Sequence, residues 1–243
     1  LFVLTDADPI RPEWHFDDFR GVLFGVTKDS RDTFWLKATG GRYYQFYDGR
    51  IKRFNPQGVM EDVRLSNLYE DKDGTIWFGS DDKGLLRINE SVVETIMVSG
   101  ANTHENILGV YKDSANRIWS GVRMGGISVR DSDGKITRLR RFKDRPLHDV
   151  NVVAEGPDGS IFFHLLYKGL GRIHPDGKRE IIDLGNDRRT TQVTAIQFLE
   201  NRMFTATHAG LYVHDLTGRE LQHYGISDGL ESDRILNMDL TRD

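Results

Sequence analysis

The chain has 243 residues, no cysteine and a formal net charge of −4, with 33 basic and 37 acidic side chains. The lack of cysteine excludes disulfide bridges and thiolate metal sites. The nearly balanced charge, without a block of like charge, gives no reason to expect nucleic acid or an anionic membrane surface as a partner. No apolar run is long enough for a membrane-spanning helix, and we recognise no leader segment at the start.

Residues 1–20 predict an incomplete structural unit. The opening LFVLTD resembles LYVHD at 211–215, which has the alternation of a strand. Pro9 and Pro12 follow, and because proline cannot donate a backbone hydrogen bond, they keep this connection out of helix and out of a central strand. We expect the segment from Trp14 to Phe16 to form an outer strand.

Residues 64–96 show the complete unit. Four short runs rich in apolar, β-branched and aromatic residues are separated by turn residues, namely LSNLYED, TIWFG, LLRI and VETI. Asp73-Gly74 lies between the first two runs and predicts a hairpin, because glycine accepts the positive φ of a tight turn. The second run carries Ile76, Trp77 and Phe78 without alternation, which indicates a strand buried on both faces.

The same unit recurs along the chain. An aromatic residue marks the second strand of each copy, at intervals of 42, 42, 43 and 42 residues: Trp35, Trp77, Trp119, Phe162 and Phe204. A glycine marks each third strand: Gly41, Gly84, Gly126, Gly169 and Gly210. Four strands per repeat of about 42 residues are typical of a propeller blade. We therefore predict an all-β fold, a β-propeller, with an open β-solenoid as the alternative.

The repeats define one propeller domain over residues 1–243. Five full blades are expected at 21–62, 63–105, 106–148, 149–191 and 192–233, with partial blades at 1–20 and 234–243. In the third blade Asn116 replaces the turn glycine, as asparagine can because it tolerates a left-handed conformation. Two interpretations of the partial blades stay open: a segment of a larger ring or array, or a six-bladed ring whose last blade combines both termini and lacks one strand. We favour the first, because a missing strand leaves an unpaired edge.

These repeats resemble a known family. EDKDGTIWFGSDDKGLLRI and KDSANRIWSGVRMGGISVR combine an acidic turn, an apolar residue, tryptophan and a glycine-led strand, and they are similar to the two-component regulator propeller repeat. The connection YGISDGLESDRILN, with Gly229-Leu230, resembles the segment between blades of that family. Phe162 and Phe204 depart from its tryptophan. The resemblance implies a periplasmic sensor region of a bacterial membrane receptor, coupled to a histidine kinase or diguanylate cyclase output.

One face of the propeller is expected to bind a ligand. In a four-stranded blade, the loops between the second and third strands lie on the same face as the connections between blades, around the central channel. The ligand-binding candidates there are Asp82, His104, Arg123, His148, His164, Tyr167, Lys168 and His208. Neighbouring loop residues are Asp81, Lys83, Glu105, Met124, Asp149, Arg189 and Asp233. Such groups suit an oligosaccharide or another polar ligand, although loop residues are also polar simply because they face water.

We expect recognition and signal relay, not catalysis. The sequence has no GxSxG, phosphate-loop or HExxH motif, and eight scattered histidines do not define a metal site. We therefore predict no catalytic residue, metal or cofactor, and a relay by rigid-body movement or by a homodimer formed through neighbouring domains. The alternatives are a polysaccharide or lactone lyase or hydrolase, in which His164, Tyr167 and His208 would have to meet at one substrate position, and a plain protein-interaction scaffold.

Overall fold

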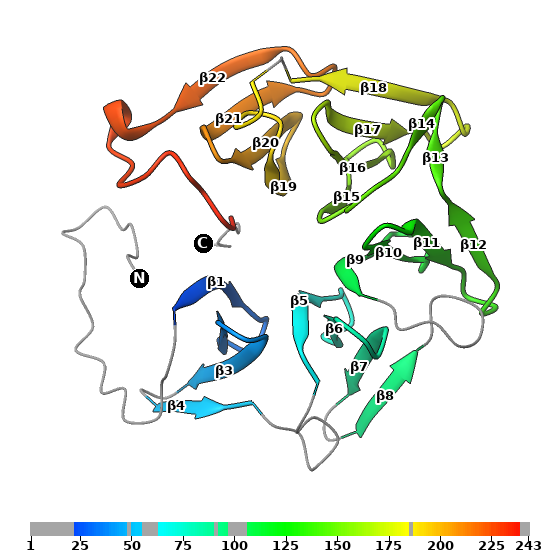
Figure 1. Cartoon of the computed structure of the whole chain (residues 1–243), viewed down its shortest axis with the longest axis vertical. Coiled ribbons are helices and arrows are strands. Elements are labelled where there is room, and N and C mark those ends of the chain that lie inside the picture. The colour runs from blue at the N-terminus through cyan, green and yellow to red at the C-terminus, as the bar shows by residue number, and fades with distance from the viewer. Residues whose placement is uncertain are drawn as a thin grey trace.

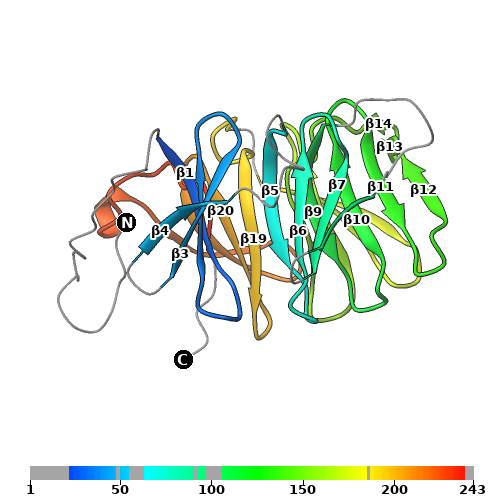
Figure 2. The same cartoon turned by 90° about the horizontal axis from the view of Figure 1, so that it is seen from below.

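Five four-stranded antiparallel sheets surround a central axis as the blades of a β-propeller (Figure 1). The computed structural model describes residues 22–47, 50–54, 63–89, 92–96, 106–184 and 187–238. In the edge-on view the strands run between two faces (Figure 2). The predicted all-β propeller with five full blades is confirmed. The partial blade expected at 1–20, including its outer strand from Trp14 to Phe16, lies outside the described residues.

In every blade the strands follow one another in chain order from the inner wall to the rim. The first blade contains β1 (Leu23–Lys28), β2 (Phe34–Ala38), β3 (Arg42–Tyr47) and β4 (Arg50–Arg53). The second contains β5 (Leu65–Glu70), β6 (Ile76–Ser80), β7 (Leu85–Asn89) and β8 (Val92–Ile96). The third contains β9 (Ile107–Lys112), β10 (Ile118–Val122), β11 (Gly126–Arg130) and β12 (Ile136–Leu139).

The remaining elements complete the ring. The fourth blade contains β15 (Val153–Glu155), β16 (Ile161–Leu165), β17 (Gly169–Ile173) and β18 (Arg179–Asp183). The fifth contains β19 (Val193–Leu199), β20 (Arg202–Thr207), β21 (Gly210–Asp215) and β22 (Glu220–Tyr224). A two-stranded hairpin follows the third blade, with β13 (Arg141–Phe142) and β14 (Arg145–Pro146). A short 3-10 helix, η1 (Ile226–Asp228), follows the fifth blade.

The core lies between neighbouring blades. Every residue of β6, β10 and β16 is buried, which confirms the prediction of second strands covered on both faces. At the first junction the Trp35 ring packs edge-on against Phe78, with ring centroids 5.6 Å apart. Trp119 lies in the cluster between the third and fourth blades, and Phe162 in the cluster between the fourth and fifth. The repeated aromatic of each of these blades therefore seals the junction to the next blade.

The repeated third-strand glycines are required by the backbone. All five adopt a positive φ, from 69° at Gly41 to 116° at Gly210. A side chain there would also meet the outer strand, because a Cβ at Gly126 would lie 2.3 Å from the Leu139 carbonyl oxygen. Asn116 has φ 61°, the left-handed conformation expected of the residue that replaces the turn glycine.

A buried aspartate holds the repeated tryptophan in the first three blades. The indole nitrogen donates to the Oδ2 atom of an aspartate six residues earlier in three pairs: Trp35 to Asp29 at 2.8 Å, Trp77 to Asp71 at 2.9 Å and Trp119 to Asp113 at 2.7 Å. In the second blade, Oδ1 of the same carboxylate accepts the backbone amides of Asp73 and Thr75, which form the hairpin turn. One side chain thus fixes both the turn and the core aromatic.

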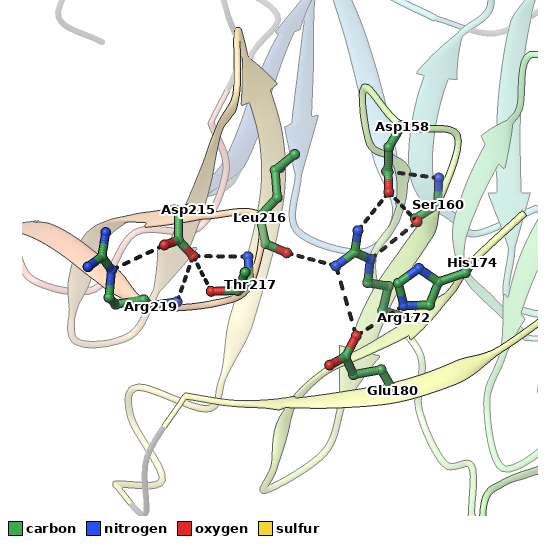
Figure 3. A network of polar contacts seen from close by, with 9 residues as sticks. All are labelled: Asp158, Ser160, Arg172, His174, Glu180, Asp215, Leu216, Thr217 and Arg219. Atoms are coloured by element: carbon green, nitrogen blue, oxygen red, sulfur yellow. Dashed lines mark hydrogen bonds and ion pairs between the residues drawn. The ribbon is translucent and has the colours of Figure 1, made fainter.

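The fourth blade lacks this pair and uses an arginine instead. Gly156 and Phe162 occupy the two positions, and Arg172, which is 9% exposed, lies with its guanidinium 5.1 Å from the Phe162 ring centroid. Its nitrogen atoms bind Asp158 Oδ2 at 2.6 Å and the Leu216 carbonyl oxygen of the fifth blade at 2.9 Å (Figure 3). A buried guanidinium therefore links the fourth and fifth blades.

The segment 234–238 occupies the inner wall between the fifth and first blades. On one side the Ile235 amide donates to the Thr207 carbonyl at 2.9 Å, and the Thr194 hydroxyl donates to the Ile235 carbonyl at 2.8 Å. On the other side Asn237 Nδ2 donates to the Val26 carbonyl at 3.1 Å. The segment therefore joins the two ends of the ring of blades where the next inner strand would lie.

Candidate functional site

An exposed aromatic side chain stands on the face expected to bind a ligand, which we call the loop face. The loop between β16 and β17 carries Tyr167, which has φ 61° and is 54% exposed. The Arg188 guanidinium lies 5.3 Å from the centroid of its ring. Arg188 comes from the connection between the fourth and fifth blades, so this cation–π contact joins two loops into one surface.

Hydrogen bonds from buried residues fix the turn that carries Arg188. The Asp187 carbonyl accepts the Thr191 amide at 3.0 Å and the Thr191 hydroxyl at 3.1 Å, and Thr191 is 1% exposed. Under this turn, His164 Nε2 lies 3.1 Å from the Thr191 carbonyl oxygen, so we assign the proton to Nε2 as donor. His164 therefore positions the turn 187–191.

A second group of contacts extends the surface toward the fifth blade. Arg189 Nε donates to the carbonyl oxygen of His208 in the β20–β21 loop at 3.2 Å. Its Nη2 atom lies 3.5 Å from Asp233 Oδ2, and Asp233 Oδ1 accepts the Ile226 amide at 2.9 Å. The Arg189 side chain is 60% exposed, so we expect this ion pair to orient the two side chains more than to stabilise the fold.

These residues form one cluster, which we call the loop-face cluster. Its members come from four segments of the chain and are Tyr167, Arg188, Arg189, His208 and Asp233. Burial, reinforced by the positive charges of Arg234 and Arg189, lowers the pKa of the His208 imidazole. A neutral imidazole offers one donor and one acceptor. With guanidinium donors, a carboxylate acceptor and an open phenol ring, the cluster can hydrogen-bond and stack against a polar ligand.

The structure brings only part of the predicted site together. Tyr167 and His208 meet in the loop-face cluster through the adjacent Arg188 and Arg189, and Lys168 is the next residue of the Tyr167 loop. The other predicted residues lie elsewhere. Arg123 and His148 are exposed near the junction of the third and fourth blades, and Asp82 lies beside Lys83 in the second blade. His104 falls outside the described residues.

The expected loop position of His164 is wrong. His164 lies within β16 and is 1% exposed, because the second strand extends to Leu165 and is covered by the neighbouring blade. Burial lowers its pKa, although its hydrogen bond to Thr191 raises it. A side chain so covered does not reach a substrate, so His164, Tyr167 and His208 do not meet at one substrate position.

Arg188 was missed in the sequence. The signal was present in the dipeptide Arg188-Arg189 within a short connection, but only the contact with Tyr167 distinguishes Arg188 from other exposed arginines. Within the described residues, no group of three or more histidine, aspartate or glutamate side chains is arranged to hold a metal ion. In the same residues no helix has the length and apolar character needed to cross a membrane.

Comparison with known families supports the sequence resemblance over one stretch. Residues 60–82 match the two component regulator propeller family. The matched stretch includes Asp71, Asp73-Gly74 and Trp77, the turn and core residues described above. The two component regulator propeller repeat is thus recognised in the second blade. No curated protein matches the chain.

Solved structures share the fold. The catalytically inactive H270A virginiamycin B lyase of Staphylococcus aureus superposes with a TM-score of 0.61 at 17% identity, covering 76% of this chain and 62% of the lyase. An extracellular domain assigned to a hybrid two component system of B. thetaiotaomicron superposes with a TM-score of 0.64 at 15% identity, covering 85% of this chain and 30% of that protein. PorZ of Porphyromonas gingivalis, a surface component of the type-IX secretion system, superposes with a TM-score of 0.65 at 16% identity, covering 90% of this chain and 36% of PorZ. The chain thus spans less than two thirds of each of these proteins.

Proposed function

We propose that this propeller is the extracytoplasmic ligand-binding region of a bacterial signal-transduction receptor, and that the loop-face cluster receives the ligand. The observation that carries the proposal is the exposed Tyr167 ring, stacked by Arg188 beside the Arg189–Asp233 ion pair. The family match at 60–82 and the fold shared with an extracellular domain assigned to a hybrid two component system support this proposal. The periplasm is the compartment that it implies.

The ligand is a polar molecule, with oligosaccharides as the first class to test. A sugar ring presents an apolar face that can lie on Tyr167, and its hydroxyl groups can bind guanidinium donors and the Asp233 carboxylate. Because the pKa of His208 is lowered, its imidazole is neutral near pH 7 and adds no charge. The cluster therefore matches hydroxyl-rich ligands without demanding a charged one.

The signal leaves the ring by rigid-body movement. Neighbouring blades are joined by hydrogen bonds as well as by core packing: the Glu70 carboxylate accepts the amide and hydroxyl of Ser30, and Glu155 accepts those of Ser114. Such contacts hold neighbouring blades together, so the ring can move as one body. Ligand binding is therefore relayed as a change in its packing against a neighbouring domain or a second copy.

A lyase or hydrolase is the second candidate, because the fold is shared with a virginiamycin B lyase. The buried position of His164 removes one of the three groups that this mechanism would need, which favours the sensor. A protein-interaction scaffold is a third candidate, and the exposed Met124 on the loop face, at 71%, is the feature that favours it.

Thermal unfolding in the presence of oligosaccharides tests the proposal. A ligand that binds only the folded chain at about 100 times its Kd adds about 2.7 kcal/mol to stability and raises the melting temperature. We expect such a rise with one class of glycan, without product formation. It should be lost in Tyr167→Ala and Arg188→Ala, and kept in Tyr47→Ala, a matched control on the first blade that is 41% exposed. Glycan cleavage would support the lyase, and an equal loss in Tyr47→Ala would refute the site.

A further inference from the structure

The hairpin at 140–147 concentrates positive charge, and we call it the basic hairpin. Its exposed cations are Arg140, Arg141, Lys143 and Arg145, with Asp144 as the only carboxylate among its eight residues. The hairpin thus has a net charge of +3 in a chain whose net charge is −4. It lies in the connection between β12 and β15, at the upper edge of the molecule in Figure 2.

The hairpin is rigid, because its apolar side chains point into the core. Phe142 is fully buried and packs edge-on against Phe163, with ring centroids 4.9 Å apart. Leu147 is 3% exposed, and its amide donates to the Arg140 carbonyl at 2.9 Å. The pairing of β13 with β14 fixes the backbone between these anchors. The backbone that carries the cations is therefore preformed, so a partner that binds does not have to order it.

In the described part of the chain, no carboxylate pairs with the cations of the hairpin. Among the described residues, its four cations make no ion pair, and the one side-chain hydrogen bond among them is donated by Arg141 to the Asp144 carbonyl. Cations at the blade junctions behave differently, since Lys112 binds Asp71 at 2.9 Å and Arg172 binds Asp158 at 2.6 Å. Like charges within eight residues repel one another. A negatively charged partner would relieve that repulsion.

We propose that the basic hairpin binds an acidic polysaccharide, one that carries sulfate or carboxylate groups. Three of the four cations are arginines, whose planar guanidinium groups pair with carboxylate and sulfate oxygens through two hydrogen bonds. Insertion into a membrane would need exposed apolar side chains, but Phe142 and Leu147 point inward. Stacking of nucleic acid bases would need an exposed aromatic ring, which the hairpin lacks for the same reason.

This surface is separate from the loop-face cluster. The hairpin lies between the third and fourth blades, whereas Tyr167, Arg188 and His208 lie between the fourth and fifth. Acidic polysaccharide binding can therefore fail while the proposed ligand site stands, and the reverse also holds.

The test measures binding of the full chain to immobilised heparin, a sulfated polysaccharide, and to polygalacturonate, a carboxylated one, with neutral dextran as the blank. We expect binding to at least one acidic polymer at low ionic strength, and a steep loss as salt screens the contacts. The variant Arg140→Gln/Arg141→Gln/Arg145→Gln should bind at least about tenfold more weakly. All three side chains are exposed, so its melting temperature should stay near that of the parent chain.

A charge-matched control separates the hairpin from general attraction. Arg50→Gln/Lys52→Gln/Arg53→Gln removes three exposed cations from β4 of the first blade and should bind like the parent chain. An equal loss of binding in this control would overturn the proposal, and so would unchanged binding by the hairpin variant. Tighter binding to phosphatidylcholine vesicles containing phosphatidylserine than to either acidic polymer would assign the surface to a membrane instead.

Discussion

The bond between Asp71 and Trp77 should carry a measurable share of the stability of the ring. Asp71 is 4% exposed, and its Oδ2 atom accepts from Trp77 Nε1 and from Lys112 Nζ, both at 2.9 Å. Burial alone would raise the pKa of Asp71, but these hydrogen bonds, together with two backbone amides, lower it. The substitution Asp71→Asn keeps the size of the side chain while placing an amide donor at the Oδ2 position, where it faces both of these donors.

The expected cost follows from these contacts. In Asp71→Asn the remaining carbonyl oxygen can still accept the turn amides of Asp73 and Thr75, so the turn is retained. The indole N–H of Trp77 loses its acceptor in a buried position, which costs about 1–3 kcal/mol, and a charged bond to Lys112 worth about 1.5–3 kcal/mol is lost. Lys112 keeps its contact with Asp73 at 2.7 Å. We therefore expect a loss of about 3 kcal/mol in the free energy of unfolding.

Urea unfolding followed by far-ultraviolet circular dichroism measures this loss, and a double-mutant cycle assigns it. Trp77→Phe removes the indole donor while keeping an aromatic ring, the arrangement already present at Phe162 beside Gly156. In that background Asp71→Asn should cost about 1–2 kcal/mol less. Asp131→Asn is the control, because among the described residues Asp131 accepts the backbone amides of its own turn and no tryptophan. Equal costs of Asp71→Asn in both backgrounds would refute the reasoning.

Two further predictions concern other buried groups. Arg172→Ala should lower the free energy of unfolding by about 3 kcal/mol, because it removes the charged hydrogen bond to Asp158, which keeps only its bonds from Ser160, and the bond to the Leu216 carbonyl. Urea unfolding beside the exposed control Arg202→Ala measures this loss. Acid should weaken the fold through His164 and His214, whose pKa values are lowered by burial from 6.5. The unfolded chain then binds more protons below about pH 6.5, so stability falls as the pH falls. His164→Asn should flatten the dependence of the melting temperature on pH between 7 and 5, whereas exposed His148→Asn should not, and equal slopes in both would contradict this assignment.

The fold could be predicted from the sequence because the residues that repeat in each blade have local physical causes. Gly126 and Gly210 are needed for a positive φ and a close approach of the outer strand, and both constraints act within one blade. Trp77 marks the second strand because it fills the junction to the next blade. Such constraints recur in every repeat, so their period can be read from one chain.

The site was harder to predict, because its members meet only after the blades are placed. His164 looks like a loop residue beside Tyr167, yet the strand continues through it and the next blade covers it. Arg188 can be recognised as a site residue only by its contact with the Tyr167 ring, which lies on another loop. The basic hairpin escaped notice as a block of charge because Phe142 and Asp144 interrupt it. Only the burial of Phe142 and Leu147 shows that the cations face outward together.

The junction of the fourth and fifth blades differs from the three junctions before it on both of its faces. On the loop face it carries Tyr167 and Arg188, while near the opposite face Arg172 replaces the aspartate–tryptophan pair and reaches across to Leu216. A guanidinium has several donors and can exchange one oxygen acceptor for another. Such a link can form again after a small shift between the two blades. We therefore expect any change in blade packing on ligand binding to concentrate at this junction, under the cluster that binds the ligand.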